Sequence, residues 1–176
     1  MPVDRAGRLA EDRICETFVL MKEEAMATPE EKLKELGIEL AAAKAGHPAM
    51  APGVLTGGNM LYLSGSTPMS AELKGRVGDA LTVEQGYQAA RECAIGQLSQ
   101  AKAVLGDLSR IKRVVKLLGM VNAAPGFGDT PAVIHGASEF YLEVFGEKGI
   151  HARSAVGLQA LPNEVAVEIE TIFEIE

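Results

Sequence analysis

The alternation of residue types over residues 165–175 constrains the fold more than any other feature of the sequence. Apolar residues and one threonine recur at every second position, and the positions between them include Glu168, Glu170 and Glu174. A period of two is typical of a β-strand that packs one face against a core and turns the other face away. The chain must therefore build a sheet, and other elements must cover the apolar side of this strand.

The preceding sequence predicts the elements that complete such a sheet. Strands are predicted at 60–65, 111–121 and 152–160, and helices at 28–37, 82–108 and 130–146. The spacing of Thr82 and Gln85 is that of a capping box, and the long helix that follows carries mainly small residues on its apolar stripe. Small residues let a helix lie close against a sheet. Two helices on one face of a mixed sheet is the economical packing, which gives an α+β fold class.

Residues 1–27 look like an extension of this domain, which we expect to span residues 28–176. Apolar residues recur in the extension every three or four positions, as in an amphipathic helix. The alternatives are a mobile tail or a true start at Met21 or Met26. The segment has no apolar core of the kind that a signal peptide needs, so a cytoplasmic location is expected.

Composition narrows the function classes. The 176 residues carry a formal charge of −7, only 5% of them are aromatic and none is tryptophan. Nucleic-acid binding relies on basic grooves and stacking rings, so this composition argues against nucleic acid as a partner. No apolar run reaches the roughly 18 residues of a membrane span. Two cysteines and three histidines in unrelated positions predict no disulfide framework, no metal site and no cofactor.

The second face of the predicted sheet is not wholly polar. Leu117, Val121, Val156, Leu158 and Ile172 are expected on it, and no predicted helix remains to cover it. An uncovered apolar face of this size is typical of a subunit interface. We therefore expect the chain to form an oligomer.

Arg153 and Glu168 are the charged residues whose positions best suit chemistry. Arg153 lies in an otherwise apolar strand beside small residues, where its guanidinium could hold a carboxylate by two hydrogen bonds. An ordinary ion pair, for example with Glu168 or Glu170, would explain the same pattern. Glu168 could position a water molecule, or it could simply be solvent-exposed like Glu174.

Several short motifs occur in an order that is informative as a series. They are Ser64-Gly65 after an apolar strand, Ile111-Lys112-Arg113-Val114-Val115-Lys116, Glu143-Val144-Phe145-Gly146-Glu147, His151-Ala152-Arg153-Ser154-Ala155-Val156, Leu161-Pro162 and Val167-Glu168-Ile169-Glu170. Over residues 28–176 the series resembles the RidA/YjgF family of reactive-intermediate deaminases, also labelled endoribonuclease L-PSP. Segments 121–127 and 133–138 resemble a long, less characterised branch of that family.

The resemblance implies a chorismate-mutase-like fold of the Bacillus type, assembled as a homotrimer with ligand clefts between subunits. It implies a hydrolase that deaminates small enamine or imine carboxylates, such as 2-aminoacrylate, to 2-keto acids and ammonia without a cofactor or metal. In that case Arg153 would bind the substrate carboxylate and Glu168 would be the catalytic group that directs water. Ser64 and Gly65 would complete the pocket with a backbone group.

Two positions depart from the family pattern. Deaminating members carry a tyrosine in the loop before the first strand, and Met50, which cannot donate a hydrogen bond, falls nearest that place. An asparagine on the second helix has two competing matches, His135 and Ser138. Met50 and His135 are therefore further candidate substrate-binding residues, and a different or more apolar substrate stays open.

Two other functions also stay open. A non-enzymatic protein that binds keto-acid-like molecules in the same cleft fits Met50 and a sequence without a recognisable nucleophile or metal set. An endoribonuclease or translation inhibitor is implied by the family label. The acidic charge and the few aromatic residues oppose that third function.

Overall fold

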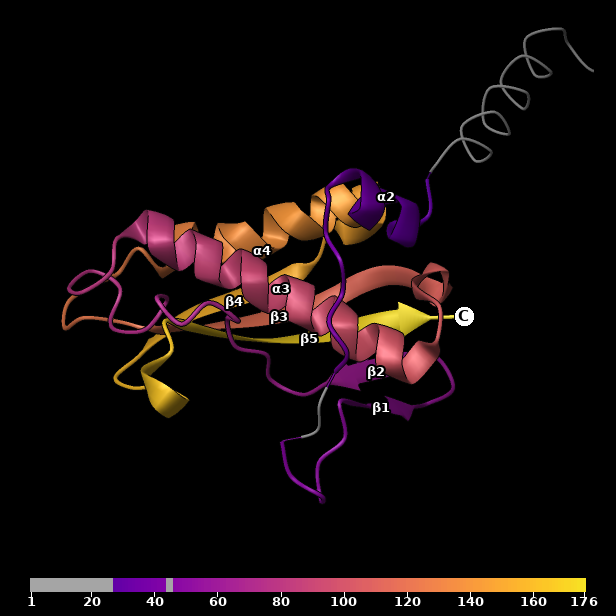
Figure 1. Ribbon diagram of the computed structural model, residues 1–176, viewed down its shortest axis with the longest axis horizontal. Coiled ribbons are helices and arrows are strands. Elements are labelled where there is room, and N and C mark those ends of the chain that lie inside the picture. The colour runs from indigo at the N-terminus through magenta and orange to yellow at the C-terminus, as the bar shows by residue number, and fades with distance from the viewer. Residues whose placement is uncertain (1–26, 44–45) are drawn as a thin grey trace, which may run out of the picture.

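Five strands form one mixed sheet in the computed structural model, which describes residues 27–43 and 46–176 (Figure 1). The strands are β1 (Gly53–Thr56), β2 (Met60–Leu63), β3 (Ile111–Asn122), β4 (Ala152–Leu158) and β5 (Val167–Ile175). Their order across the sheet is β1-β2-β5-β3-β4. Strands β3 and β4 are parallel and the other neighbours are antiparallel, which confirms the predicted mixed sheet. The expectation for the N-terminal extension falls on residues 1–26, outside the described residues.

Helices α3 (Val83–Leu105) and α4 (Thr130–Phe145) lie side by side on one face of the sheet (Figure 1). A short helix, α2 (Pro29–Glu35), packs against α4. Single 3₁₀ turns are η1 (Leu108–Arg110), η2 (Gly146–Gly149) and η3 (Pro162–Glu164). The predicted covering of one face by two helices is confirmed. Among the described residues no helix is both long and apolar enough to cross a membrane.

The helix ends follow from local chemistry that the sequence displays. The hydroxyl of Thr82 accepts a hydrogen bond from the backbone N–H of Gln85, and Oε1 of Gln85 accepts one from the backbone N–H of Thr82. Thr28 and Glu31 make the same reciprocal pair at the start of α2. Each pair satisfies N–H groups that a helix start otherwise leaves free.

Strand β1 is an element that the sequence pattern did not predict, since the first predicted strand begins at residue 60. It pairs with β2 as a hairpin whose connection contains Gly57 and Gly58. Both glycines have positive φ, 62° and 82°, which suits the tight turns that join twisted antiparallel strands. Three of the four residues of β1 are exposed, so the strand has no buried face that would produce an alternating pattern in the sequence.

Leu117 and Val121 lie under the helices, which corrects the expectation that they belong to the uncovered face. A register irregularity interrupts the pairing of β3 with β5 between Val114 and Lys116. Such a bulge reverses the alternation of side chains, so Leu117 joins Val114 on the covered face. Leu117 and Val121 are fully buried.

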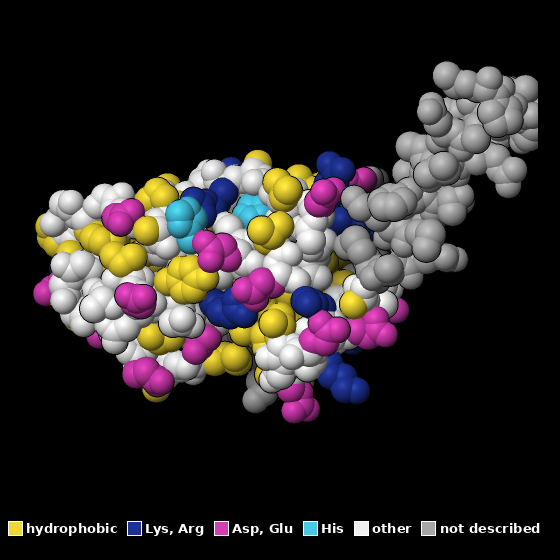
Figure 2. Space-filling model, turned by 90° about the horizontal axis from the view of Figure 1, so that it is seen from above, with side chains coloured by type: hydrophobic (Ala, Val, Ile, Leu, Met, Phe, Trp, Pro, Cys, Tyr) yellow, Lys and Arg dark blue, Asp and Glu magenta, His cyan; other side chains and the backbone are white. Residues whose placement is uncertain are grey.

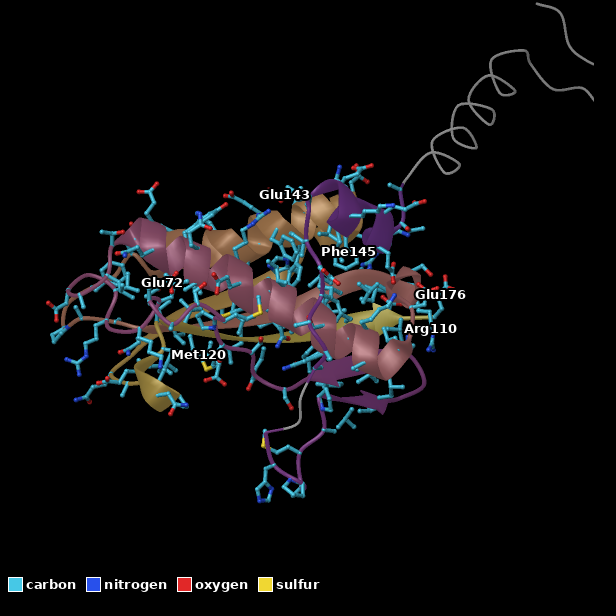
Figure 3. All side chains as sticks on the ribbon, in the orientation of Figure 1. Glu72, Arg110, Met120, Glu143, Phe145 and Glu176 are labelled. Carbon is cyan, nitrogen blue, oxygen red and sulfur yellow. The ribbon has the colours of Figure 1, made fainter. Side chains whose placement is uncertain are left out.

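The face of the sheet away from the helices nevertheless carries apolar side chains. Val156 and Leu158 are more than a third exposed there, and Ile172 is partly exposed between glutamates of β5. Figure 3 shows Met120 pointing out from this face, whereas Phe145 lies between α4 and the sheet. Tyr62, which is opposite Ile172 in the register, adds an exposed ring. We call this surface the open face.

Close approach of α3 and α4 makes Gly136 sensitive to substitution. A Cβ at Gly136 would collide with the backbone carbonyl of Tyr87. An unobstructed glycine-to-alanine change within a helix stabilises by about 1 kcal/mol. We expect Gly136→Ala instead to destabilise by about 2 kcal/mol, because the helices must move apart. Urea unfolding at matched protein concentration measures the difference.

The control for this prediction is Gly128→Ala just before α4, where an added Cβ would meet no atom within 4 Å. That variant should unfold within about 0.5 kcal/mol of the parent. Equal stability of the Gly136 and Gly128 variants would contradict the close contact between the two helices.

Candidate functional site

Arg153 owes its position to the β3–α4–β4 crossover. Because β3 and β4 are parallel, α4 must cross the sheet between them, and it packs on the side of β4 that includes Arg153 and Ala155. Small residues keep the contact close: the carbonyl of Ala155 accepts a hydrogen bond from Thr130, and a Cβ at Gly157 would touch Thr130. The guanidinium of Arg153 therefore extends along the groove between edge strand β4 and α4.

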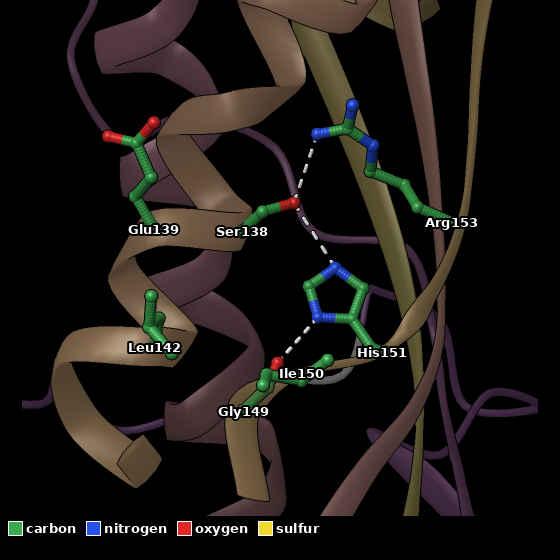
Figure 4. Close-up of a pocket in the computed structure, with 7 residues that line it drawn as sticks. All are labelled: Ser138, Glu139, Leu142, Gly149, Ile150, His151 and Arg153. Atoms are coloured by element: carbon green, nitrogen blue, oxygen red, sulfur yellow. Dashed lines mark hydrogen bonds between the residues drawn. The ribbon is translucent and has the colours of Figure 1, made fainter. Parts of the chain in front are cut away.

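Three side chains form a continuous hydrogen-bonded chain in this groove (Figure 4). Nη1 of Arg153 donates to Oγ of Ser138 over 3.1 Å. The same Oγ lies 3.1 Å from Nε2 of His151, and Nδ1 of His151 lies 2.6 Å from the carbonyl oxygen of Gly149. The ring of Tyr141 meets the His151 ring edge-on at 5.9 Å between centroids. The imidazole is thus fixed at both nitrogens and on one side.

A pocket of about 300 Å³ opens beside this chain. Its lining residues are Ser138, Glu139, Leu142, Gly149, Ile150, His151 and Arg153. Leu142 and Ile150 contribute exposed apolar surface next to the polar groups. The pocket therefore combines a guanidinium with an apolar wall, a surface that suits a carboxylate with a short organic chain.

The charge of Arg153 is not neutralised within the described part of the chain, where no carboxylate pairs with it. Glu139 lines the same pocket but accepts a hydrogen bond of 2.8 Å from the hydroxyl of Tyr87. Burial lowers the pKa of His151; its hydrogen bond to Gly149 opposes this effect, and the charge of Arg153 adds to it. The groove thus presents one cation and a neutral imidazole at neutral pH.

A second group of predicted site residues gathers around the end of β2. The backbone N–H of Ser64 donates to Pro52 over 2.9 Å, and its hydroxyl donates to the carbonyl of Ala51 over 2.7 Å. A Cβ at Gly65 would collide with the carboxylate of Glu168, so only glycine lets that side chain lie directly over the backbone. Burial, and then the neighbouring charge of Glu170, raises the pKa of Glu168.

Gln97 of α3 supports this second group and was not singled out from the sequence. Its side chain is fully buried and donates to the carbonyl of Ser64 over 2.8 Å. A polar residue that interrupts the small apolar stripe of the long helix was the available signal. The Gln97 amide holds the Ser64–Gly65 backbone from the helix-bearing side of the sheet, and the Glu168 side chain lies over the same backbone from the open face.

The structure places Arg153 and Glu168 on opposite faces of the sheet. Arg153 faces α4 from edge strand β4, whereas Glu168 lies on the open face of β5, opposite Met120. Strand β3 separates the two strands. An ion pair between Arg153 and Glu168 within one chain is therefore absent, and a ligand that touches both residues needs two chains.

The remaining candidates separate between these two groups. Met50 is 54% exposed in the loop whose neighbours Ala51 and Pro52 hold Ser64, so it belongs to the group on the Glu168 side. His135 is exposed on α4, one turn before Ser138. Of the two residues that competed for the asparagine position, Ser138 is the one that contacts Arg153. His151 was missed as a site residue, although a spacing of two from Arg153 puts it on the same side of the chain.

Surface charge is mixed on the helix-bearing side of the molecule. Figure 2 shows acidic, basic and apolar side chains interspersed over α3 and α4, without a continuous basic surface. Within the described residues there is also no cluster of three His, Cys, Asp or Glu side chains that could hold a metal ion. Cys93 is fully buried, and burial raises the pKa of its thiol.

The order of strands, the two covering helices and the crossover define an α+β chain of the chorismate-mutase-like class. A family model described as "YjgF/chorismate_mutase-like, putative endoribonuclease" matches residues 30–169. Protein TCP17 of Trypanosoma cruzi is 44% identical over 147 residues, which make up 81% of this chain and 91% of that protein. The chain belongs to the YjgF/RidA family, as its motifs indicated.

Two solved structures resemble the whole domain. Protein Atu1372 of Agrobacterium tumefaciens, described as of unknown function, is 43% identical with a TM-score of 0.78, and the match covers 84% of this chain and 92% of that one. A "putative endoribonuclease" of Shewanella oneidensis is 31% identical with a TM-score of 0.80, and the match covers 85% of this chain and all of that one.

Proposed function

We propose that this protein is a hydrolase that deaminates small enamine or imine carboxylates, such as 2-aminoacrylate, in a cleft between subunits of a cytoplasmic homotrimer. The observation that carries the proposal is Arg153, whose guanidinium faces a pocket and pairs with no carboxylate of the described chain. A planar guanidinium holds a carboxylate by two parallel hydrogen bonds. The product would be the corresponding 2-keto acid.

An enamine such as 2-aminoacrylate first gains a proton from solvent on its terminal carbon and loses one from nitrogen, which gives the imine. The remaining chemistry asks little of the protein, since the imine carbon is electrophilic. Water adds its oxygen to that carbon, the carbon–nitrogen bond then breaks, and ammonia leaves with the hydrogens supplied by water and solvent. Glu168 would orient the water and accept its proton, and its raised pKa makes it a stronger base than an exposed glutamate. Arg153 would fix the carboxylate so that the reacting carbon meets the water.

The two groups of residues can act on one substrate only if they come from different chains, because they lie on opposite faces of one sheet. The exposed apolar residues of the open face give a second copy a surface to bury. A closed ring of three chains would bring β4 and α4 of one subunit beside the Glu168 side of the next.

The test is an assay of the purified protein with freshly generated 2-aminoacrylate. We expect pyruvate and ammonia to form faster than in buffer, in proportion to the protein concentration. Release at the rate of the buffer control, in a sample that is shown to be a folded trimer, would refute the deaminase.

Met50 favours a second candidate, a non-enzymatic protein that binds 2-keto acids in the same cleft. Its thioether is exposed and cannot donate the hydrogen bond that a tyrosine hydroxyl would supply there. Melting temperatures that rise with added pyruvate, without turnover of 2-aminoacrylate, would favour binding over catalysis. For the endoribonuclease of the family description, RNA cleavage that survives stringent purification is the required result.

A further inference from the structure

The hydrogen-bonded chain beside Arg153 has a fixed direction when His151 is neutral. A carbonyl oxygen only accepts, so the nitrogen that faces Gly149, Nδ1, carries the hydrogen. Nε2 of the neutral ring is then an acceptor, and the hydroxyl of Ser138 must donate to it. The proton of Ser138 is thereby directed at His151, away from any ligand in the pocket.

Protonation of His151 reverses the middle link of this chain. Both ring nitrogens then donate, so Oγ of Ser138 accepts from His151 and from Arg153 at once. Its own hydrogen is no longer used within the chain and can turn toward the pocket. One added proton thus supplies the pocket with a second cation and with a hydroxyl donor beside the guanidinium.

The groups that surround His151 do not stabilise its protonated form, so a bound anion would have to do so. From α4 it meets Ser138 and the ring of Tyr141, whose hydroxyl bonds Thr171 and whose pKa is raised by burial. From η2 it meets the Gly149 carbonyl. Two residues further along the chain, on β4, the charged group is Arg153, which repels a proton on the imidazole.

The other charged side chains near His151 form hydrogen bonds with groups other than the imidazole. Glu139 lines the pocket but is held by Tyr87. On β3, Leu117 lies opposite Arg153, and Lys116 points to the other face of the sheet, where it donates to Ser154. A carboxylate that binds Arg153 would offset the charge that disfavours a protonated His151.

We propose that Arg153, Ser138 and His151 form a site that takes up a carboxylate together with one proton, with the proton on His151 and the hydroxyl of Ser138 turned to the ligand. The inference rests on the proposed function, because it adopts Arg153 as the carboxylate-binding group. It adds that His151 is a positioning residue, acting on the ligand through Ser138.

The sign of the pH dependence follows from linkage. The ligand favours protonated His151, so the pKa of this group is higher in the bound state than in the free state. Binding is strongest below the pKa of the free protein and weakens as pH rises through the range between the two pKa values. One proton taken up changes Kd by up to about tenfold per pH unit in that range.

Isothermal titration calorimetry of the full chain with pyruvate tests the proposal. Titrations between about pH 5.5 and about pH 8, in buffers of different ionisation enthalpy, give both Kd and the number of protons taken up. We expect proton uptake on binding and a Kd about tenfold lower at the acidic end than at the basic end. Pyruvate binding without uptake and with a constant Kd overturns the proposal.

Three substitutions show which residue takes up the proton when pyruvate binds. His151→Gln keeps a polar side chain that cannot be protonated, and we expect it to bind pyruvate weakly and with little pH dependence. His47→Gln, which removes an exposed histidine from the loop near Met50, should keep the parental pH dependence. Ser138→Ala should weaken binding most at the acidic end, where its hydroxyl would serve the ligand.

The outcomes separate this inference from the proposed function. Proton uptake that persists in His151→Gln would assign it to another group, such as Glu168, and would overturn the role of His151 while leaving the carboxylate site intact. Pyruvate that fails to bind the parent, or that binds Arg153→Ala equally well, refutes the arginine site and this inference with it. Turnover of 2-aminoacrylate with pH-independent pyruvate binding would retain the deaminase and overturn only the proton coupling.

Discussion

Replacement of Arg153 by alanine is expected to lower kcat/KM for 2-aminoacrylate by about 100-fold. Loss of one partner from a hydrogen-bonded charge pair in a partly buried site costs about 2–5 kcal/mol, and a 100-fold loss in kcat/KM corresponds to an energy within this range. The groove offers no second cation at neutral pH to take over, because burial lowers the pKa of His151. Steady-state rates of ammonia release measure the effect.

Two further substitutions identify the cause of that loss. Arg153→Lys keeps the charge but not the planar pair of donors, so an intermediate loss of about tenfold is expected. Arg113→Ala removes the same charge from a side chain that is 67% exposed and pairs loosely with Glu174, at 3.6 Å. Equal losses for Arg153→Ala and Arg113→Ala would point to net charge and would contradict a local carboxylate site.

Mixed oligomers of two inactive variants are expected to regain activity. Arg153→Ala retains Glu168, and Glu168→Gln retains Arg153, so a cleft formed between one chain of each kind can contain both wild-type groups. A trimer that contains both variants has one such cleft among its three, so a tandem-purified sample should regain about a third of the wild-type sites. Co-expression with two different tags, followed by tandem purification and the ammonia assay, measures the recovery.

The expected recovery in mixed oligomers follows from where Arg153 and Glu168 lie within one chain. Arg153 faces α4 and Glu168 faces the open side of the sheet, so neither can reach the other's ligand within a subunit. A doubly substituted chain mixed with itself should stay inactive and serves as the baseline. No recovery in mixed oligomers, with wild-type controls active after the same treatment, would show that each chain carries its own complete site.

Much of the fold could be predicted because its signals are local. The capping boxes at Thr28 and Thr82 and the period of two over 165–175 each depend on residues a few positions apart, and the structure bears them out. The bulge between Val114 and Lys116 depends instead on how β3 pairs with β5, which lies more than fifty residues away. Strict alternation could not reveal it, and Leu117 was therefore assigned to the wrong face.

The candidate site was predictable as a set of residues but not as an arrangement. Arg153 and Glu168 stood out because each is a charge within a strand pattern. Their separation by the sheet depends on the crossover through α4, which the sequence does not display. The sequence analysis considered the histidines only as metal ligands and so missed His151, although its spacing of two from Arg153 lets both side chains reach Ser138 of α4.

The central place of β5 has a consequence for how this domain acquires its shape during synthesis. Strand β5 lies between β2 and β3, and β2 touches no other long strand of the sheet. Until residues 167–175 have left the ribosome, the hairpin of β1 and β2 has no partner, and α3 has no complete surface to cover. Helices α3 and α4 end at residues 105 and 145, so their apolar faces stay uncovered until the last residues of the sheet are available. Chaperones would protect the chain from aggregation in that late interval of its synthesis.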